Sequence, residues 1–233
     1  VITMLPTAAI VADVLLAPAT RAALARDTLV IDMSSSEPDT TVKLGEALAA
    51  HGVRLIDAPV SGGVARAQAG TLAIMAGGDA ADVARAAPLL QLMGSSLTHV
   101  GPLGAGHAVK ALNNLMSAGG LLLAAEAFAA GAKFGVDPAT MLAVINGSSG
   151  RNNSTETKLA PFVFSRNCNS GFALDLMVKD LGIALILQAT QGTPHGLSER
   201  VFAAWQTAQD ELGPGRDHTE IVRWVEAAAG LAL

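Results

Sequence analysis

The stretch TLVIDMSSSEPDTTVKLGEALAAHGVRLIDAPVSGG, residues 28–63, decides the fold. It contains an apolar, β-branched run over 28–34, a helix-length segment, and a second apolar run over 53–60. Such runs suit strands buried on both faces of a sheet, and their alternation with helices suits parallel βαβ units. We expect Ser36 to open the helix, with Glu37 and Pro38 in its first turn. The stretch therefore predicts an α/β sheet.

The same alternation extends over residues 1–101, with further strand-like runs VITML (1–5), TLAIMAGG (71–78) and LTHVG (97–101). Pro102, Gly104 and Gly106 mark a change of character, and no convincing strand follows. Helical patterns then cover 105–134, 137–145, 174–191, 197–211 and 219–229. We predict an α/β domain over 1–101 and an all-helical domain over 102–233 that begins with a long helix.

Composition narrows the possible partners. The net charge is −5 with no run of like charge, which argues against a nucleic acid or an anionic membrane surface. The single cysteine, Cys168, excludes an internal disulfide and favours a reducing compartment such as the cytoplasm. No Cys/His cluster has metal-ligand spacing. The apolar run 115–132 contains Glu126, which would be costly in lipid, so we expect a buried helix there.

The segment DAPVSGG, residues 57–63, is the first candidate site. Ligands of open parallel sheets bind beyond the carboxyl ends of strands, where Ser61, Gly62 and Gly63 should fall. Their backbone N–H groups and one hydroxyl could hold an anion such as a carboxylate. The alternative is an ordinary tight turn in which glycine supplies a positive φ.

The segment GAGHAVKALNNLMS, residues 104–117, is the second candidate. Gly106, Lys110 and Asn114 are four residues apart and share one helix face, with Ser117 three residues further on. This stripe could be a solvent face along which the lysine snorkels. A lysine in a cleft would instead have a lowered pKa and could donate or accept a proton.

Two polar segments in the helical half have open roles. In LMVKDLGIAL, Lys179 and Asp180 interrupt an apolar helix; they are either surface charges or site residues, and neighbours in sequence do not share a helix face. The segment SSGRNNSTETK, residues 148–158, is either a solvated loop or one that faces a substrate.

Five motifs together resemble a known family. ITMLPT, IDMSSSEP, DAPVSGGVARAQAGTLAIMAGG, GPLGAGHAVKALNN and LMVKDLGIAL occur in the order and spacing of the β-hydroxyacid dehydrogenases, which include 3-hydroxyisobutyrate dehydrogenase and tartronate semialdehyde reductase. The resemblance covers residues 1–229. It implies a Rossmann-type NAD(P)-binding domain joined by a long helix to an all-helical domain.

The resemblance also implies roles for individual residues. Lys110 matches the catalytic lysine, which exchanges the hydroxyl proton during reversible hydride transfer with a small 3-hydroxy acid. Substrate-binding positions are Ser61, Gly62, Gly63 and Asn114. Cofactor-binding positions are Leu5, Pro6, Ser36 and Lys179. No metal is implied.

Several points stay open at this level. The G-x-G-x-x-G turn of such enzymes is absent, so we expect about 60 further residues before Val1, and the choice between NAD and NADP lies there. The substrate could be 3-hydroxyisobutyrate-like, tartronate semialdehyde- or glycerate-like, or threonate-like, and the polar residues Arg151, Asn152 and Asn153 favour a more hydroxylated or acidic one.

Three rival readings remain, along with an expectation about assembly. The rivals are an imine reductase, which usually lacks the lysine; a 6-phosphogluconate dehydrogenase, which needs a longer helical region; and a catalytically inactive binding module. The helices of the second half carry more apolar surface than one small helical domain can bury. We therefore expect a homodimer or homotetramer.

Overall fold

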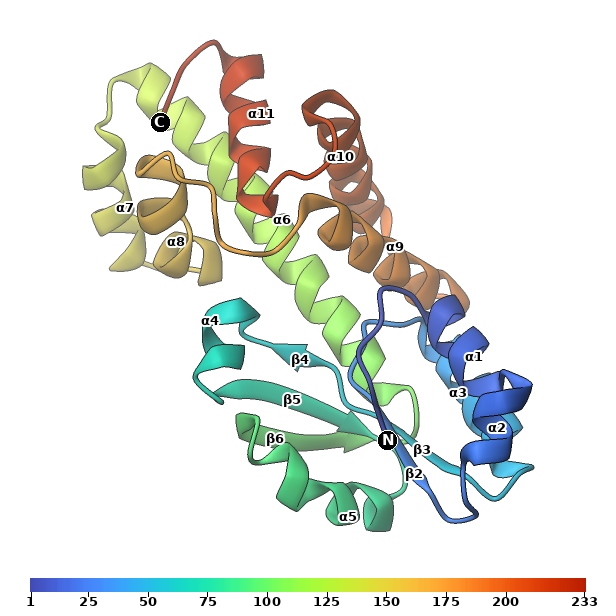
Figure 1. Ribbon diagram of the computed structural model, residues 1–233. Coiled ribbons are helices and arrows are strands. Elements are labelled where there is room, and N and C mark those ends of the chain that lie inside the picture. Colours follow the sequence, from blue (N-terminus) through green and yellow to red (C-terminus); the bar gives the residue numbers. More distant parts are fainter. The chain divides into compact units, whose positions relative to one another are not determined.

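The chain divides into two compact units, Val1–Leu112 and Asn113–Leu233, and the computed structural model describes all 233 residues (Figure 1). The division falls inside helix α6 (Ala105–Phe134), so this helix contributes its first two turns to one unit and the remainder to the other.

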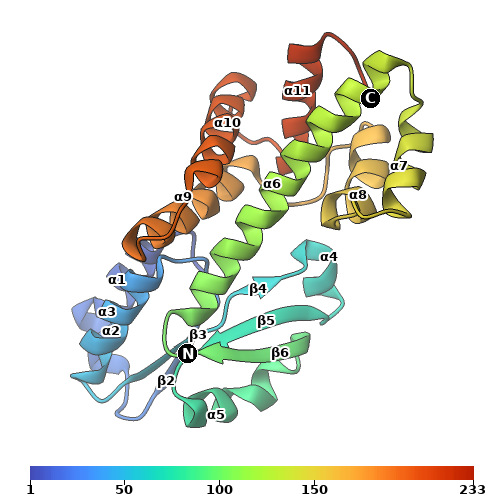
Figure 2. The same ribbon diagram turned by 180° about the vertical axis from the view of Figure 1, so that it is seen from behind.

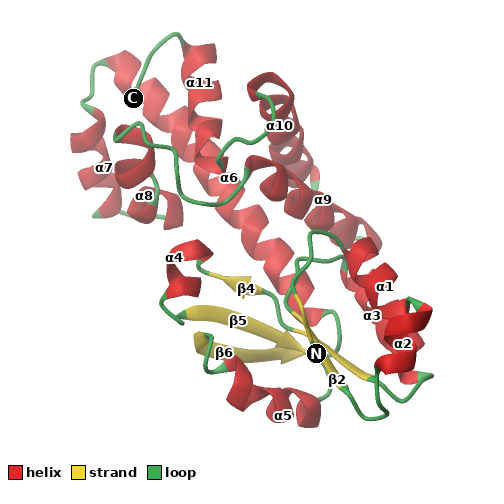
Figure 3. Ribbon diagram, viewed as in Figure 1, coloured by secondary structure: helices red, strands yellow, loops and turns green.

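The first unit is a sheet with helices on both faces (Figure 3). Its strands are β1 (Ile2–Thr3), β2 (Leu29–Asp32), β3 (Arg54–Asp57), β4 (Val60–Ser61), β5 (Leu72–Gly77) and β6 (Gly94–Gly101). The strand order is β1-β2-β3-β5-β4, and β6 pairs with β5. Its helices are α1 (Ala8–Leu16), α2 (Pro18–Ala23), α3 (Pro38–Ala49), α4 (Gly63–Gln68) and α5 (Ala80–Leu90).

The apolar runs of the strands are explained by this two-sided burial. In β2, Val30 packs with α1 and α3, whereas its neighbour Ile31 packs with α5. In β3, Leu55 and Ile56 divide in the same way. Successive strand residues point to opposite faces, so a strand covered on both sides needs an unbroken apolar run. The predicted α/β sheet is confirmed.

The sheet departs from the parallel βαβ pattern at β5. Strands β1, β2 and β3 are parallel, and so are β5 and β6, but β5 runs antiparallel to both β3 and β4. Only residues 62–71 connect β4 to β5, and they hold the short helix α4. A parallel crossover needs about a dozen residues or more, so the chain turns back instead.

The expected start of α3 is also shifted. The helix begins at Pro38 with Glu37 as its N-cap residue, and no side chain caps it. Ser36 instead donates its hydroxyl to Asp32 Oδ2 at 3.4 Å. A nearby buried carboxylate therefore competes for the serine that would otherwise cap the helix.

The second unit is helical (Figure 2). Its elements after α6 are α7 (Pro138–Asn146), α8 (Asn153–Thr157), the π-helix η1 (Leu159–Phe164), α9 (Leu174–Thr190), α10 (Gly196–Leu212), the 3₁₀-helix η2 (His218–Glu220) and α11 (Ile221–Ala229). All five predicted helices are present, each within two residues of its expected ends. Asp137 caps α7 and Asp217 caps η2 through their side-chain carboxylates.

Helix α6 supplies the centre of this unit. Leu121, Ala125 and Phe128 are fully or almost fully buried and pack in one cluster with Trp205 of α10. By length and composition α6 is also the one helix that could cross a membrane. Its packing in the core agrees with the buried helix that the sequence predicts.

Candidate active site

The glycine-rich loop after β4 has the backbone that its sequence predicts. Gly62 has φ +136° and Gly63 has φ +65°, both in the region that favours glycine. A Cβ at Gly62 would come within 2.7 Å of the Cβ of Arg66. Gly62 and Gly63 are exposed, and Ser61 is half-buried. The turn requires glycine, and its backbone is also exposed, so an ordinary tight turn and an anion-binding loop are compatible here.

Asp57, at the end of β3, has a role that the sequence did not predict. Its carboxylate is fully buried and accepts hydrogen bonds from the backbone N–H groups of Gly104 and His107, both at 2.7 Å. These groups form the N-terminal end of α6, where a negative charge is stabilised by the helix dipole. Asp57 therefore ties the start of α6 to the sheet. An acidic residue at the end of an apolar strand was the sequence feature that could have indicated this role.

A second buried acid, Asp32, ends the neighbouring strand. It accepts a hydrogen bond from Thr3 Oγ1 at 2.9 Å, and His107 Nε2 lies 3.8 Å from its Oδ2. The other ring nitrogen of His107, Nδ1, is 2.8 Å from Thr41 Oγ1. These contacts join β1, β2, α3 and α6, so His107 has a structural role.

Gly106 lets α6 approach the sheet closely. A Cβ there would collide with the carbonyl oxygen of Met75 and lie 3.1 Å from Pro59 Cδ. Pro59 belongs to the DAPVSGG segment, so this segment and the first turn of α6 are in contact. Lys110 follows one turn later on the same stripe and is only 9% exposed. The burial of Lys110 contradicts the solvent-face alternative.

In the helical unit, Asn114 is fixed by an acid on α9. Its Nδ2 donates to Asp180 Oδ2 at 2.6 Å, and both side chains are buried. Lys179 Nζ lies 3.2 Å from Asp180 Oδ1. Neighbours in sequence do not share a helix face, yet Lys179 and Asp180 form a local pair, because the long lysine side chain can reach the adjacent carboxylate although their Cβ atoms diverge. Asp180 thus sets the orientation of the Asn114 amide.

The residues predicted to line the cofactor lie in two loops at the carboxyl ends of β1 and β2. Leu5 N–H donates to Ser34 Oγ at 2.9 Å, which joins these loops, and Pro6 follows it on the surface. Dinucleotides bind at this edge of open α/β sheets, so the position of the loops fits the group. Ser36 is 2% exposed, with its hydroxyl turned to Asp32. The fourth residue, Lys179, belongs to the other unit.

The polar connection 148–158 is neither a loop throughout nor wholly solvated. Arg151 pairs with Glu156 at 3.5 Å with 60% of its side chain exposed, and Asn152 forms the capping box of α8. The structure thus gives these two residues local roles. Asn153 begins α8.

Lys158, at the end of that connection, was not singled out from the sequence. Its Nζ donates to Ser117 Oγ at 2.8 Å, and burial lowers the pKa of this lysine to about 8. His218 is also buried; desolvation, helped by the charge of Lys158, lowers its pKa to about 4. The helical unit therefore contains a desolvated cation next to the stripe that carries Asn114.

We expect the free energy of unfolding to rise with pH because of Lys158. Its pKa is about 8 in the folded chain and 10.5 when exposed, so between these values the unfolded chain binds more protons and stability increases, by roughly 3 kcal/mol in total. Below pH 8 the burial penalty is constant. Urea unfolding followed by the fluorescence of Trp205 and Trp224, both in this unit, measures the effect. Lys158→Met should remove the rise; parallel curves for the two proteins would contradict the assignment.

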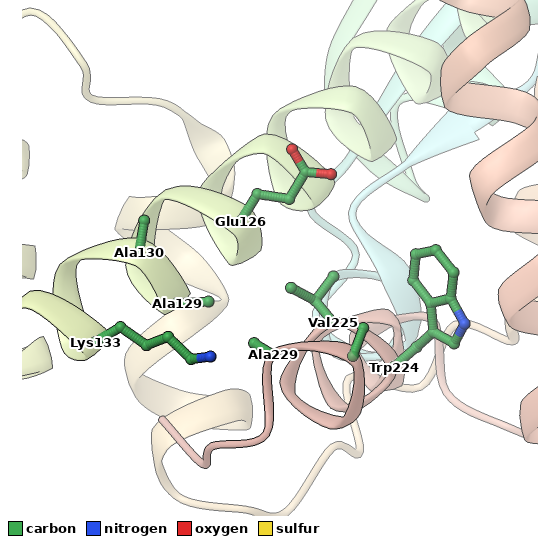
Figure 4. A pocket seen from close by; sticks show the side chains of 8 residues that line it. Glu126, Ala129, Ala130, Lys133, Trp224, Val225 and Ala229 are labelled. Carbon is green, nitrogen blue, oxygen red and sulfur yellow. The ribbon is translucent and has the colours of Figure 1, made fainter.

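A surface groove and Cys168 lie apart from the predicted site residues. An open groove of about 390 Å³ lies between α6 and α11, where Ala129, Ala130 and Val225 are flanked by Trp224 and Lys133 (Figure 4). None of the predicted site residues lines it. No group of three or more His, Cys, Asp or Glu side chains could hold a metal ion. Burial raises the pKa of the Cys168 thiol, which suits an inert residue.

Comparison with known proteins identifies the family. Residues 1–101 match the NAD-binding domain of 6-phosphogluconate dehydrogenase, and residues 104–225 match the NAD-binding domain of NADP-dependent 3-hydroxyisobutyrate dehydrogenase. The 2-(hydroxymethyl)glutarate dehydrogenase of Eubacterium barkeri is 42% identical over 235 residues, covering 100% of this chain and 78% of that protein. The 3-hydroxyisobutyrate dehydrogenase of Pseudomonas aeruginosa is 41% identical over 210 residues, covering 86% of this chain and 70% of that one.

A solved structure agrees with both matches. The 3-hydroxyisobutyrate dehydrogenase of Mycobacterium tuberculosis with L-serine superimposes with a TM-score of 0.88 at 32% identity, covering 96% of this chain and 78% of that one. The chain thus shares sequence over both of its halves, and its fold, with enzymes that oxidise small hydroxy acids. It belongs to the β-hydroxyacid dehydrogenase family and is an oxidoreductase that uses NAD or NADP.

Proposed function

We propose that this enzyme oxidises a small 3-hydroxy acid, with Lys110 as the general acid and base. The observation that carries the proposal is the burial of Lys110, one turn beyond Gly106, where α6 contacts Pro59 of the DAPVSGG segment. A buried ammonium on that helix and a loop suited to a carboxylate could hold one small acid between a proton acceptor and an anchor. Imine reductases usually replace this lysine, so its presence speaks against that rival.

The site residues divide the work of the reaction. Ser61, Gly62 and Gly63 hold the substrate carboxylate through backbone N–H groups and the serine hydroxyl. When bound, NAD or NADP would supply the acceptor for the hydride that leaves the carbinol carbon. Lys110 removes the hydroxyl proton as that carbon becomes a carbonyl, and returns it in the reverse direction. Asn114, held by Asp180, orients the substrate or the lysine.

The proposed function also assigns roles to the two domains and to the residues that contact the cofactor. We propose that residues 1–101 are the remainder of the Rossmann-type NAD(P)-binding domain and that residues 102–233 form the helical domain. Within them, the cofactor contacts are Leu5, Pro6, Ser36 and Lys179. For Ser36 the turned-in hydroxyl favours a role in shaping the loop as well as in contacting the cofactor.

The enzyme should discriminate among small hydroxy acids. We expect oxidation of at least one of 3-hydroxyisobutyrate, 2-(hydroxymethyl)glutarate, glycerate and threonate, measured as kcat/KM at saturating NAD and then NADP. Titration of NADH or NADPH, followed by nicotinamide fluorescence, gives cofactor affinity without turnover. Binding without oxidation of any of these acids would favour the inactive binding module over the dehydrogenase.

We also propose that the chain forms a homodimer or homotetramer in the cytoplasm. Three large apolar side chains of α6 are well exposed: Met116 at 79%, Leu123 at 65% and Phe134 at 90%. Exposed apolar surface of this kind is characteristic of protein interfaces. Sedimentation equilibrium of the purified enzyme measures the subunit number.

A further inference from the structure

Lys158 places a positive charge beside the residues that are proposed to orient the substrate. Its side chain is 9% exposed, and its Nζ donates to Ser117 Oγ. Ser117 follows Asn114 by three residues, so the two side chains leave the same face of α6 with Cβ atoms about 5–6 Å apart. The ammonium therefore lies one turn of helix beyond the Asn114 amide.

This ammonium lacks a carboxylate partner within the protein. It forms no ion pair with an Asp or Glu within 4.0 Å, and one of its three N–H groups donates to Ser117 Oγ. The charge of Asp217 acts on it, but that carboxylate already accepts hydrogen bonds from Ser170 and from both the N–H and the hydroxyl of Thr219. His218 is neutral at physiological pH and supplies no negative charge. A buried cation without a partner is destabilising, and such groups cluster at ligand sites.

The backbone around Lys158 is held firmly against α6. Ser154 Oγ donates to the carbonyl oxygen of Ser117 at 3.4 Å, and the Asn152 amide lies near Gly120, at an ordinary contact distance of 3.6 Å from where a Cβ would stand. The π-helix η1 begins at the residue after Lys158, and π-helical turns are frequent at functional sites. The connection that carries Lys158 thus contacts α6 at Ser117 and Gly120, one to two turns beyond Asn114.

We propose that Lys158, supported by Ser117, binds a second acid group of the substrate, so that the enzyme prefers a dicarboxylic hydroxy acid. The inference rests on the proposed function. In 2-(hydroxymethyl)glutarate four C–C bonds separate the carbinol carbon from the far carboxyl carbon, which is about 5 Å in extended form. Ser117 lies seven residues, about 10 Å, beyond Lys110 along α6, and the acid with a hydrogen bond of about 3 Å at each end has a comparable span.

Overall similarity does not choose between the two substrate classes. The relative named for a dicarboxylic substrate is 42% identical, and the one named for the monocarboxylic 3-hydroxyisobutyrate is 41% identical. The chemistry at Lys158 makes the choice, because a monocarboxylic substrate would leave its charge uncompensated.

The test compares two substrates in the same enzyme. The ratio of kcat/KM for 2-(hydroxymethyl)glutarate to that for 3-hydroxyisobutyrate should favour the former, and Lys158→Met should lower this ratio about 10- to 100-fold, the usual effect of a charged hydrogen bond. In the unmodified enzyme the ratio should also fall above pH 8, as Lys158 loses its proton. This pH profile needs no variant and distinguishes a binding role from a structural one.

Two cations of the same unit serve as controls. Arg151→Gln and Lys133→Met, at exposed positions, should leave the ratio unchanged. A ratio that depends on Arg151, or one that is the same in Lys158→Met as in the unmodified enzyme, would overturn the proposal.

A measurement without turnover separates this inference from the proposed function. Calorimetry should show that glutarate binds more tightly than butyrate, and that Lys158→Met abolishes the difference. If neither hydroxy acid is oxidised but this difference is found, the dehydrogenase proposal fails while the anion site stands. Equal affinities for glutarate and butyrate would remove the anion site.

Discussion

Lys110→Ala should lower kcat by a factor of roughly 10²–10⁴ on the best hydroxy acid substrate, the usual contribution of one general acid–base group. The loss is expected in both directions of the reaction, because the same ammonium would take the hydroxyl proton in oxidation and return it in reduction. Lys110→Met, which keeps most of the buried methylene volume, should be equally impaired. Steady-state kinetics at saturating cofactor provide the measurement.

Three controls distinguish this chemical role from damage to the fold. Circular dichroism of Lys110→Ala should match the unmodified enzyme, and NADH or NADPH should still bind, because the cofactor contacts lie in other segments. Lys43→Ala removes an exposed lysine of α3 in the same unit and should leave kcat unchanged. Normal turnover by Lys110→Ala would show that another group moves the proton.

Asp57→Ala should lower the free energy of unfolding by about 3–5 kcal/mol. The carboxylate is fully buried and accepts two backbone N–H groups at 2.7 Å, so its removal leaves two buried donors at the start of α6 without their acceptor. The closely packed Gly77 and Gly106 leave little space for other groups to replace it. The loss should appear in urea unfolding followed by circular dichroism, because both tryptophans lie in the helical unit and do not report on the sheet directly.

The matched control is another aspartate of the same unit. Asp27 is paired with Arg54 at 3.2 Å and with Arg85 at 3.5 Å, but its side chain is 71% exposed. Because Asp27 has φ +65°, a conformation that asparagine tolerates better than alanine, the control is Asp27→Asn, which should cost no more than about 1 kcal/mol, as is usual for exposed ion pairs. Equal losses for Asp27→Asn and Asp57→Ala would mean that the hydrogen bonds from the start of α6 to Asp57 contribute little beyond its charge.

Elements with one dominant local signal were predictable from the sequence. The long apolar run of α6 ends at Phe134 before Gly135, and Asp137 caps the next helix, so these limits follow from composition and capping. The stripe of Gly106, Lys110 and Asn114 follows from helical periodicity. Each of these features depends on residues close together in the chain.

The remaining features depend on residues far apart in the chain. Asp57 is 47 residues from Gly104, Asn114 is 66 from Asp180, and Ser117 is 41 from Lys158. The polar residues around Arg151 mark the connection 148–158 in the sequence. The burial of Lys158 at its end depends on residues that only the fold brings around it. The identity of an acidic or basic residue in the sequence does not reveal whether its charged group is solvated or buried.

The sequence by itself determined the α/β-then-helical order, the helix limits and the stripe of α6, because backbone propensity and side-chain periodicity act over a few residues. Tertiary structure alone decided the antiparallel direction of β5, the hydrogen bonds from the start of α6 to Asp57, and the desolvation of Lys158. These depend on which distant groups exclude water from one another, and burial, unlike periodicity, is a property of the packed chain.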